Sequence, residues 1–247
     1  MKEINIVSDK NYIDYLYYIK KNLTHKKVKM ISVICNINDM SILSIATNDA
    51  DFNLISAKLK LLICDAILYI YKENFIKQNI NFGSLNEIYQ TALLKALVLF
   101  DSESDRQIIK SKLNLDKDIY LNSFFNFRLQ VLKSRWKDVV RLANENTSNF
   151  LESEIFLDLL KFLVTTLKPR TELINVYFNG RTFEYLDAKQ KKIKNAQITN
   201  GSDELSLITT LITLAPNAIN LHCIDMLSNN TFKVLYYIFD KKVNLLV

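Results

Sequence analysis

The sequence predicts an α+β protein, and three of its features carry that prediction. Runs rich in β-branched and aromatic residues lie near both ends of the chain, which favours strands there. Between these ends, apolar residues recur at helical spacing. Only three glycines and two prolines are present to interrupt the patterns. We therefore expect a helical middle region, 51–168, flanked by a small N-terminal α/β segment, 1–50, and a C-terminal α/β unit, 169–247.

The N-terminal segment is expected to combine strands with a single helix. The stretch "EINIVS" has the composition of a strand, and residues 10–22 show helical spacing. The stretches "VKMISVIC" and "MSILSIAT" follow, and together they predict a β-hairpin.

The middle region is expected to be helical because its apolar residues fall on one side of a helix and it contains almost no Gly or Pro. The expected helices span residues 52–77, 84–100, 103–112, 117–144 and 148–167. The last helix has to stop at Pro169, because proline removes a helical hydrogen bond and restricts the residue before it.

The C-terminal unit begins with a predicted hairpin. The stretches "ELINVYF" and "RTFEYL" are rich in β-formers, and Asn179-Gly180 between them favours a two-residue turn. A helix over 203–214 is expected next, with Ser202 as its N-cap and Pro216 as the reason for its end.

The rest of the unit completes a β-β-α-β-α-β order. Residues 219–223 alternate as a strand does, which points Cys223 inward and His222 outward. The stretch "NNTFKVLYYIF" predicts a helix, and "KVNLLV" predicts a final strand. Because a strand, a helix and another strand in succession form parallel pairs, the unit should hold a mixed sheet.

Composition limits the possible chemistry. The net charge of +6, from 32 Lys and Arg against 26 Asp and Glu, permits an anionic partner without requiring one. The scarcity of glycine excludes a Gly-rich phosphate loop. The neighbouring His222 and Cys223 lack the paired spacing of a zinc site, so no metal and no cofactor are predicted.

Cysteine usage and the N-terminus predict a cytoplasmic location. Cys35, Cys64 and Cys223 are widely separated and odd in number, which fits a reducing compartment. Polar and acidic residues near the N-terminus leave no room for a signal peptide. The longest uncharged run, 207–224, carries too many Thr, Asn and His residues to cross a bilayer, so no transmembrane segment is expected.

Three stretches resemble a known family. They are "YLNSFFNFRLQVLKSRWKDVV", "ESEIFLDLLKFLVTTLKPRTELINVYFNGRTFEYLD" and "LITTLITLAPNAINLH". Over roughly 117–247 the chain is similar to the YtxC-like proteins, a sporulation family of endospore-forming Firmicutes. The resemblance implies a cytosolic role during spore formation. It implies no catalytic residue, because these motifs are architectural.

Arg128 is the first candidate site residue. An apolar stripe on the predicted 117–144 helix contains Leu121, Phe125, Leu132 and Val139. Arg128 falls within this stripe, so it is expected to be buried and to need a partner. The candidate ion-pair partners are Glu154 and Asp158 on the next helix. The alternative is that Arg128, with Arg135 one heptad later, contacts an anion or a partner protein.

Basic clusters raise a nucleic-acid alternative. They are the runs that begin at His25 and Lys189 and the helical set Lys133, Arg135, Lys137 and Arg141. The helical set is interrupted by acidic residues but carries Trp136. An exposed Trp136 could stack on a base while the cations bind phosphates.

The most direct interpretation is a cytosolic protein of endospore formation that acts by protein binding. At least one tyrosine of the helix that carries Tyr12, Tyr15, Tyr17 and Tyr18 should be exposed, and exposed aromatic residues suit interfaces. A nucleic-acid-associated factor is the alternative. A small-molecule enzyme comes third, because His222 and Cys223 point to opposite faces of a strand and therefore form no catalytic dyad.

Overall fold

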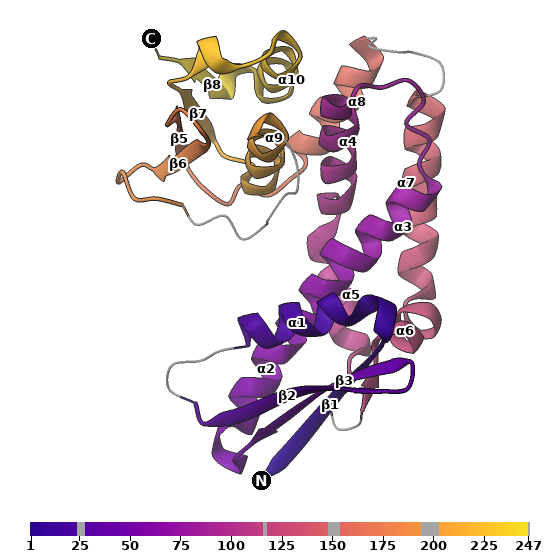
Figure 1. Cartoon of the computed structure of the whole chain (residues 1–247). Coiled ribbons are helices and arrows are strands. Elements are labelled where there is room, and N and C mark those ends of the chain that lie inside the picture. The colour runs from indigo at the N-terminus through magenta and orange to yellow at the C-terminus, as the bar shows by residue number, and fades with distance from the viewer. Residues whose placement is uncertain (24–27, 116–117, 148–153, 194–202, 247) are drawn as a thin grey trace. The chain divides into compact units, whose positions relative to one another are not determined.

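The computed structural model describes residues 1–23, 28–115, 118–147, 154–193 and 203–246, and it confirms an α+β protein (Figure 1). The chain folds into two compact units, each built around its own sheet. The N-terminal unit comprises 1–75 and 102–137, and the C-terminal unit comprises 76–101 and 138–247. The helical residues 51–168 are therefore divided between the two units.

The N-terminal unit has a sheet with the strand order β2-β3-β1-β4. Its strands are β1 (Lys2–Asp9), β2 (Met30–Ile37), β3 (Met40–Thr47) and β4 (Ile119–Tyr120). β1 is antiparallel to β3 and parallel to β4. The predicted hairpin is confirmed as β2 and β3, which Asn38 and Asp39 join in a two-residue turn, with Asn38 at a φ of +52°.

Helices cover one face of this sheet. They are α1 (Ile13–Asn22) and α2 (Asp49–Ala66), which contact its strands, while α5 (Ser102–Lys112) packs on α2. The helix α3 (Lys72–Asn79) follows α2 in the chain. A π-helical turn, Ile67–Tyr71, joins α2 to α3, and a 3-10 turn, Lys10–Tyr12, precedes α1. On β3, buried and half-buried residues alternate, and Leu43 and Ile45 pack with Leu16 and Ile19 of α1 in the core. The alternate side chains of the sheet face away from these helices.

The expected single helix over 117–144 is wrong. This stretch holds β4, α6 (Leu121–Ser123), a π-helical turn (Phe124–Arg128) and α7 (Gln130–Thr147). Leu129 breaks the helix, with φ −108° and ψ 25°. Its side chain is fully buried, so the backbone departs from helical geometry at the residue that enters the core.

The C-terminal unit confirms the predicted β-β-α-β-α-β order. Its elements are β5 (Leu173–Phe178), β6 (Phe183–Asp187), α9 (Asp203–Leu214), β7 (Ala218–Leu221), α10 (Asn229–Phe239) and β8 (Val243–Leu245), with one-turn helices at Ile224–Met226 and Asp240–Lys242. The strand order is β6-β5-β7-β8, with β5 antiparallel to β6 and parallel to β7. Since β7 is also parallel to β8, the sheet is mixed, as predicted.

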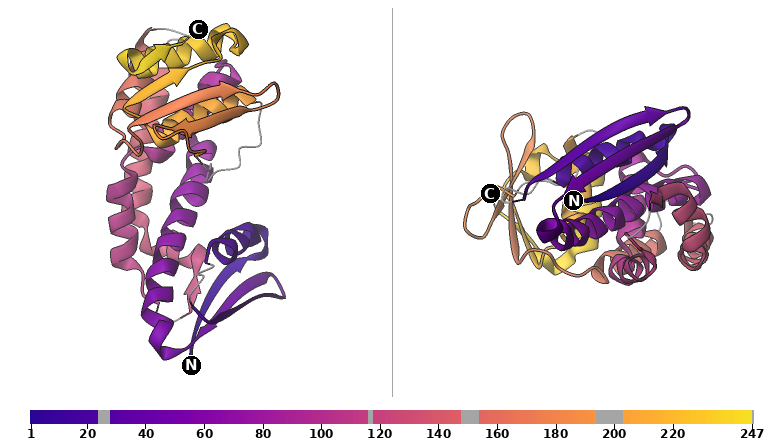
Figure 2. Two further views of the ribbon diagram at one scale, coloured as in Figure 1. Left: turned by 90° about the vertical axis from the view of Figure 1, so that its left-hand side faces the viewer. Right: turned by 90° about the horizontal axis from the view of Figure 1, so that it is seen from below.

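Four helices form layers behind this sheet. Parallel crossovers are nearly always right-handed, which puts α9 and α10 on the same face of the sheet. The left view of Figure 2 shows the sheet in front of α9. Behind them, α4 (Glu87–Leu99) packs on α9, and α8 (Glu154–Thr165) packs on α10. Val176 and Leu221 point into this core, where Tyr89 and Phe156 meet edge to face at 5.6 Å. The opposite face of the sheet carries the polar side chains of the same strands.

Candidate functional site

Arg128 is exposed, so the prediction that it is buried is wrong. It ends the π-helical turn one residue before Leu129, and Leu129 takes the buried position instead. The prediction assumes one continuous helix over 117–144, but the helix breaks at Leu129, so the apolar stripe does not continue through Arg128. An exposed guanidinium is solvated, so no buried carboxylate is needed to neutralise it.

The two predicted partners of Arg128 belong to the other unit. Asp158 accepts a hydrogen bond from the hydroxyl of Tyr237 at 2.9 Å, which ties α8 to α10. The side chain of Glu154 lies outside the described residues. With Arg128 exposed, the physical reason to expect either ion pair is gone.

Trp136 is buried, which corrects the assumption that it is exposed for stacking. Because α7 begins at Gln130, its buried stripe is Leu132, Trp136, Val140 and Ala143. Arg135 is exposed beside this stripe, and its guanidinium lies 3.4 Å from the hydroxyl of Ser104. The helical basic set therefore has no stacking ring at Trp136, which weakens the nucleic-acid alternative.

A buried ion pair lies beside Trp136 and was missed at the sequence level. The ammonium of Lys72 is 2.8 Å from Oδ2 of Asp105, and the two side chains are only 3% and 2% exposed. The indole Nε1 of Trp136 donates to the same oxygen at 2.8 Å. The Lys72 ammonium also lies 5.5 Å from the Trp136 ring centroid. One carboxylate oxygen thus joins α3, α5 and α7.

A cluster of aromatic rings continues from this pair. Tyr71 packs against Tyr15 and against Phe125, with ring centroids 4.7 Å apart in both contacts. Burial is the main cause that raises the pKa of Tyr15 and of Tyr71 above its ordinary value. Tyr17 is exposed, as expected for at least one tyrosine of α1. The buried rings are neutral, and the cluster is part of the core.

The His222 and Cys223 pair behaves as the sequence predicts. Cys223 is buried and His222 is exposed just beyond β7. Burial raises the pKa of the Cys223 thiol to about 11, so it is protonated at neutral pH and is a poor nucleophile. The imidazole of His222 instead stacks on Tyr177, with ring centroids 4.2 Å apart.

The face of the C-terminal sheet opposite its buried Ile174 and Val176 side chains carries a row of asparagines. Asn175, Asn220 and Asn244 lie in register on three parallel strands. Asn244 donates to Asn220 at 3.1 Å, and Asn220 donates to Asn175 at 2.8 Å. Each side-chain amide donates a hydrogen bond to the amide oxygen on the neighbouring strand, and these bonds favour the observed register.

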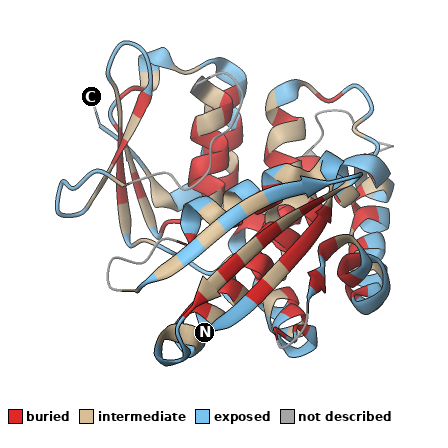
Figure 3. Ribbon diagram, turned by 60° about the horizontal axis from the view of Figure 1, so that its bottom comes forward, coloured by how far each residue is buried: buried red, intermediate tan, exposed pale blue. Residues whose placement is uncertain are grey.

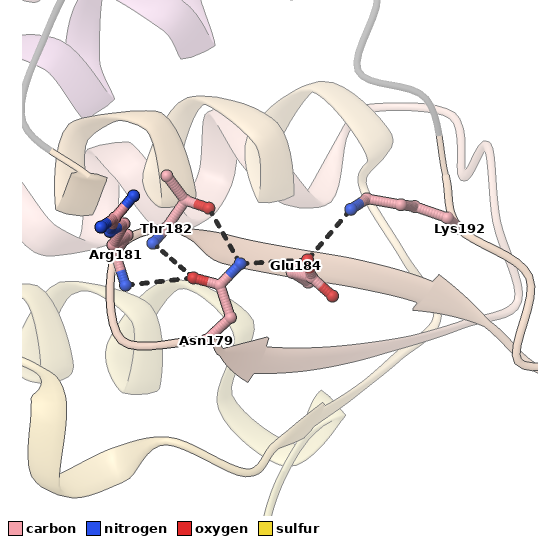
Figure 4. Close-up of polar contacts among 5 residues, drawn as sticks. All are labelled: Asn179, Arg181, Thr182, Glu184 and Lys192. Atoms are coloured by element: carbon pink, nitrogen blue, oxygen red, sulfur yellow. Dashed lines mark hydrogen bonds and ion pairs between the residues drawn. The ribbon is translucent and has the colours of Figure 1, made fainter.

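The β5–β6 loop differs from the expected two-residue turn. Phe178 pairs with Phe183, so the loop contains four residues, 179–182. The side-chain Oδ1 of Asn179 accepts from the backbone N–H groups of Arg181 and Thr182, at 3.0 and 2.9 Å (Figure 4). These bonds close the loop, while Gly180 alone takes a positive φ, +90°.

Two acidic side chains, Glu184 and Asp187, bind the basic run that begins at Lys189. Lys192 pairs with Glu184 at 3.0 Å (Figure 4), and Asp187 accepts from the backbone of Lys189 and Lys191. Hydrogen bonds and nearby lysines lower the pKa of both carboxyl groups. Lys194, the run at His25–Lys27 and Ser202 lie outside the described residues.

A small exposed group at the start of α7 is the strongest candidate for a contact with a partner. We call the side chains of Phe127, Arg128, Val131 and Arg135 the junction surface. Phe127 is 76% exposed and Val131 is 60% exposed, and both arginines are exposed as well. The helix break at Leu129 places these apolar and cationic groups next to one another in the chain. Aromatic residues and arginine are enriched in protein interfaces.

The described ranges contain neither a membrane-spanning helix nor a metal-binding cluster. No helix there combines the length and the apolar character needed to cross a bilayer. No set of three or more His, Cys, Asp or Glu side chains in that part of the chain is placed to bind a metal ion.

Comparison with known proteins places the chain in a family. Neither the curated proteins nor the solved structures gave a significant match. The sequence model of the YtxC-like family matches residues 57–244, which extends further toward the N-terminus than the resemblance over 117–247. The match takes in α7, the strands β5, β6 and β7, most of β8, and the helices that pack on this sheet. The chain therefore belongs to the YtxC-like family.

Proposed function

We propose that this protein acts in endospore formation by binding another protein, and that the junction surface is the contact. Family membership supports the context, because the YtxC-like proteins are a sporulation family. The observation that carries the binding role is the exposed Phe127 beside Arg128. A large apolar ring that is left in water and flanked by a cation gains most when a partner covers it.

The junction surface also indicates the chemistry of the partner. Arg128 and Arg135 can each bind a carboxylate at two points, and Phe127 and Val131 add exposed apolar area. A partner segment with an apolar side chain flanked by acidic residues would fit these groups. The buried Trp136 and Cys223 support binding over base stacking and over thiol chemistry, respectively.

The test combines two substitutions at the junction surface. Phe127→Ser with Arg128→Ala removes the exposed ring and the cation and touches no core residue. We expect the thermal midpoint to stay within a few degrees of the wild type, because exposed side chains contribute little to stability. We expect the count of heat-resistant spores to fall in a strain that carries this variant.

Phe162→Ser is the matched control, because Phe162 is another exposed phenylalanine, on α8 of the other unit. It should leave the spore count unchanged. A normal spore count with the junction variant would show that the proposed contact is wrong. A salt-sensitive mobility shift of DNA or RNA that the Arg128→Ala change abolishes would instead support the nucleic-acid alternative.

A further inference from the structure

The helix α2 has a second apolar side, away from the core of the N-terminal unit. Four exposed residues form this side, which we call the α2 seam: Ala50, Leu54, Ala57 and Leu61. The two leucines are 48% and 40% exposed. Ile55, Leu59 and Leu62 of the same helix are buried on its other side. Because α2 is apolar on both sides, one side can pack in the core while the other contacts a further helix.

The spacing of the α2 seam is that of a helix that pairs with another helix. Its residues are separated by four, three and four positions, the heptad spacing at which the side chains of two helices interlock. Alanine and leucine alternate along the seam. In an antiparallel pair of α2 helices, Leu54 can therefore lie opposite Ala57 of the second copy, and Leu61 opposite Ala50. Each large side chain then fills the space beside a small one.

The charges beside the α2 seam fit the same register. Asp51 and Lys58 occupy equivalent heptad positions on one side of the seam, and Asn53 and Lys60 occupy equivalent positions on the other. About a two-fold axis, equivalent sides of two antiparallel helices meet. In the register that pairs each leucine with an alanine, Asp51 faces Lys58 of the second copy at both ends of the contact, and Asn53 faces Lys60. Such flanking residues set the orientation and the choice of a partner helix.

Other arrangements of two α2 helices bring like charges together or lack a charge pair. A shift by one heptad sets Asp51 against Asp51, or Lys58 against Lys58, of the second copy, and it pairs only half of the α2 seam. In a parallel pair the oppositely charged neighbours would be Lys60 and Asp65. Asp65 already binds Arg106 at 2.6 Å within its own chain. Charge and size thus favour one antiparallel register.

The edge strand β2 of the same unit is also apolar and exposed, and Figure 3 shows this outermost strand in pale blue and tan. It contains no charged residue, so its side chains select neither a partner nor a register. The α2 seam combines exposed apolar area with a self-complementary pattern of charge. We infer that two copies of this chain associate through antiparallel α2 helices, with Asp51 of each copy facing Lys58 of the other. This inference does not depend on the junction surface.

The experiment mixes two charge variants of the full chain. Asp51→Lys alone sets lysines against each other across the contact, and Lys58→Asp alone sets aspartates against each other. Because a contact between single helices is small, sedimentation equilibrium should cover about 10 μM to about 1 mM, where we expect the wild type to dimerise. Each variant alone should raise the dissociation constant at least about tenfold. An equimolar mixture of the two should restore association, because every lysine then faces an aspartate.

Leu54→Asp tests the apolar part of the α2 seam. It should be a monomer with unchanged far-ultraviolet circular dichroism, because the position is exposed. Ile31→Asp is the matched control, since Ile31 is an exposed residue of β2 in the same unit, and it should remain a dimer. A wild type that is monomeric over the whole range, or a mixture that stays monomeric, would show that the inference is wrong. A dimer that survives Leu54→Asp and is lost with Ile31→Asp would place the contact on β2 instead.

Discussion

At the scale of single residues, burial decides what each ionisable side chain can do. Lys72 and Asp105 are removed from water and paired, whereas Arg128 and Arg135 remain solvated. A buried pair is held by its geometry, and removing one partner strands the other charge. Charged side chains thus stabilise the core at Lys72 and Asp105 and remain on the surface at Arg128 and Arg135.

Asp105→Leu should destabilise the fold by about 3 to 5 kcal/mol, because it removes the buried carboxylate that pairs with the Lys72 ammonium and accepts from the Trp136 indole. Combining Asp105→Leu with Lys72→Met should recover part of this loss. Urea denaturation measures both effects. Glu145→Ala, which breaks the exposed pair with Arg141, is the matched control and should cost less than about 0.5 kcal/mol. Equal costs for the buried and the exposed pair would contradict this account.

The cysteines should differ in reactivity by their burial. Burial raises the pKa values of Cys64 and Cys223 to about 11, while Cys35 is exposed. Iodoacetamide at neutral pH should therefore modify Cys35 in the native protein and spare the other two, and all three should react in urea. Peptide mass spectrometry reads the sites. Rapid native labelling of Cys223 would revive the enzyme interpretation.

Arg128 and Lys72 show why burial of single charges was hard to predict. Lys72 shares i, i+4 spacing with the apolar Leu68 and Ile76, so the stripe argument applied at Arg128 would have found a buried cation at Lys72. The argument failed at Arg128 because the helix breaks at Leu129. Helical spacing locates a buried charge only where the helix continues, and the break depends on packing.

At the scale of elements, hydrogen bonds from side chains to the backbone settle where helices and turns begin. Asn48, Asn86 and Ser228 cap the helices α2, α4 and α10. Asn179 closes the β5–β6 loop in the same way. The sequence predicted these helices from the helical spacing of their apolar residues, and the caps, which are local signals, set the residue at which each helix begins. The four-residue β5–β6 loop was not predicted, because Asn179 suits either a two-residue Asn-Gly turn or a longer loop that its side chain closes.

Glu204 links two helix starts and should make stability depend on pH. It accepts from the backbone N–H and the hydroxyl of Ser228, both at 2.6 Å, and from Thr231 at 2.5 Å. Burial raises the pKa of Glu204, but these hydrogen bonds outweigh burial and lower it overall. The folded state therefore favours the carboxylate. Its stabilisation is present above the unfolded pKa and is lost as the pH falls through the lowered folded pKa.

Glu204→Gln should accordingly lower the free energy of unfolding by about 1 kcal/mol at neutral pH, the usual contribution of such hydrogen bonds. The difference from the wild type should disappear in acid, where the wild-type carboxyl group is protonated. Thermal melts at several pH values measure this convergence. If Glu204→Gln lowers stability equally at every pH, the effect comes from altered packing of the side chain and not from loss of the carboxylate charge.

At the scale of the whole molecule, two units are each held by a separate sheet. The family match covers residues 57–244, and the strands β1, β2 and β3 all precede it. The proposed partner contact at Phe127 thus lies within the matched region.

The sequence by itself determined the class of fold, the helices other than the one expected over 117–144, the strand pairs of both hairpins, the mixed order of the C-terminal sheet and the inward and outward directions of Cys223 and His222. Each of these depends on periodicity or on a local turn or cap, which neighbouring residues specify. Tertiary structure alone decided that Arg128 is exposed, that Trp136 is buried and that Lys72 meets Asp105. These outcomes depend on contacts between residues distant in the chain and on the backbone break that buries Leu129, and no local pattern encodes them.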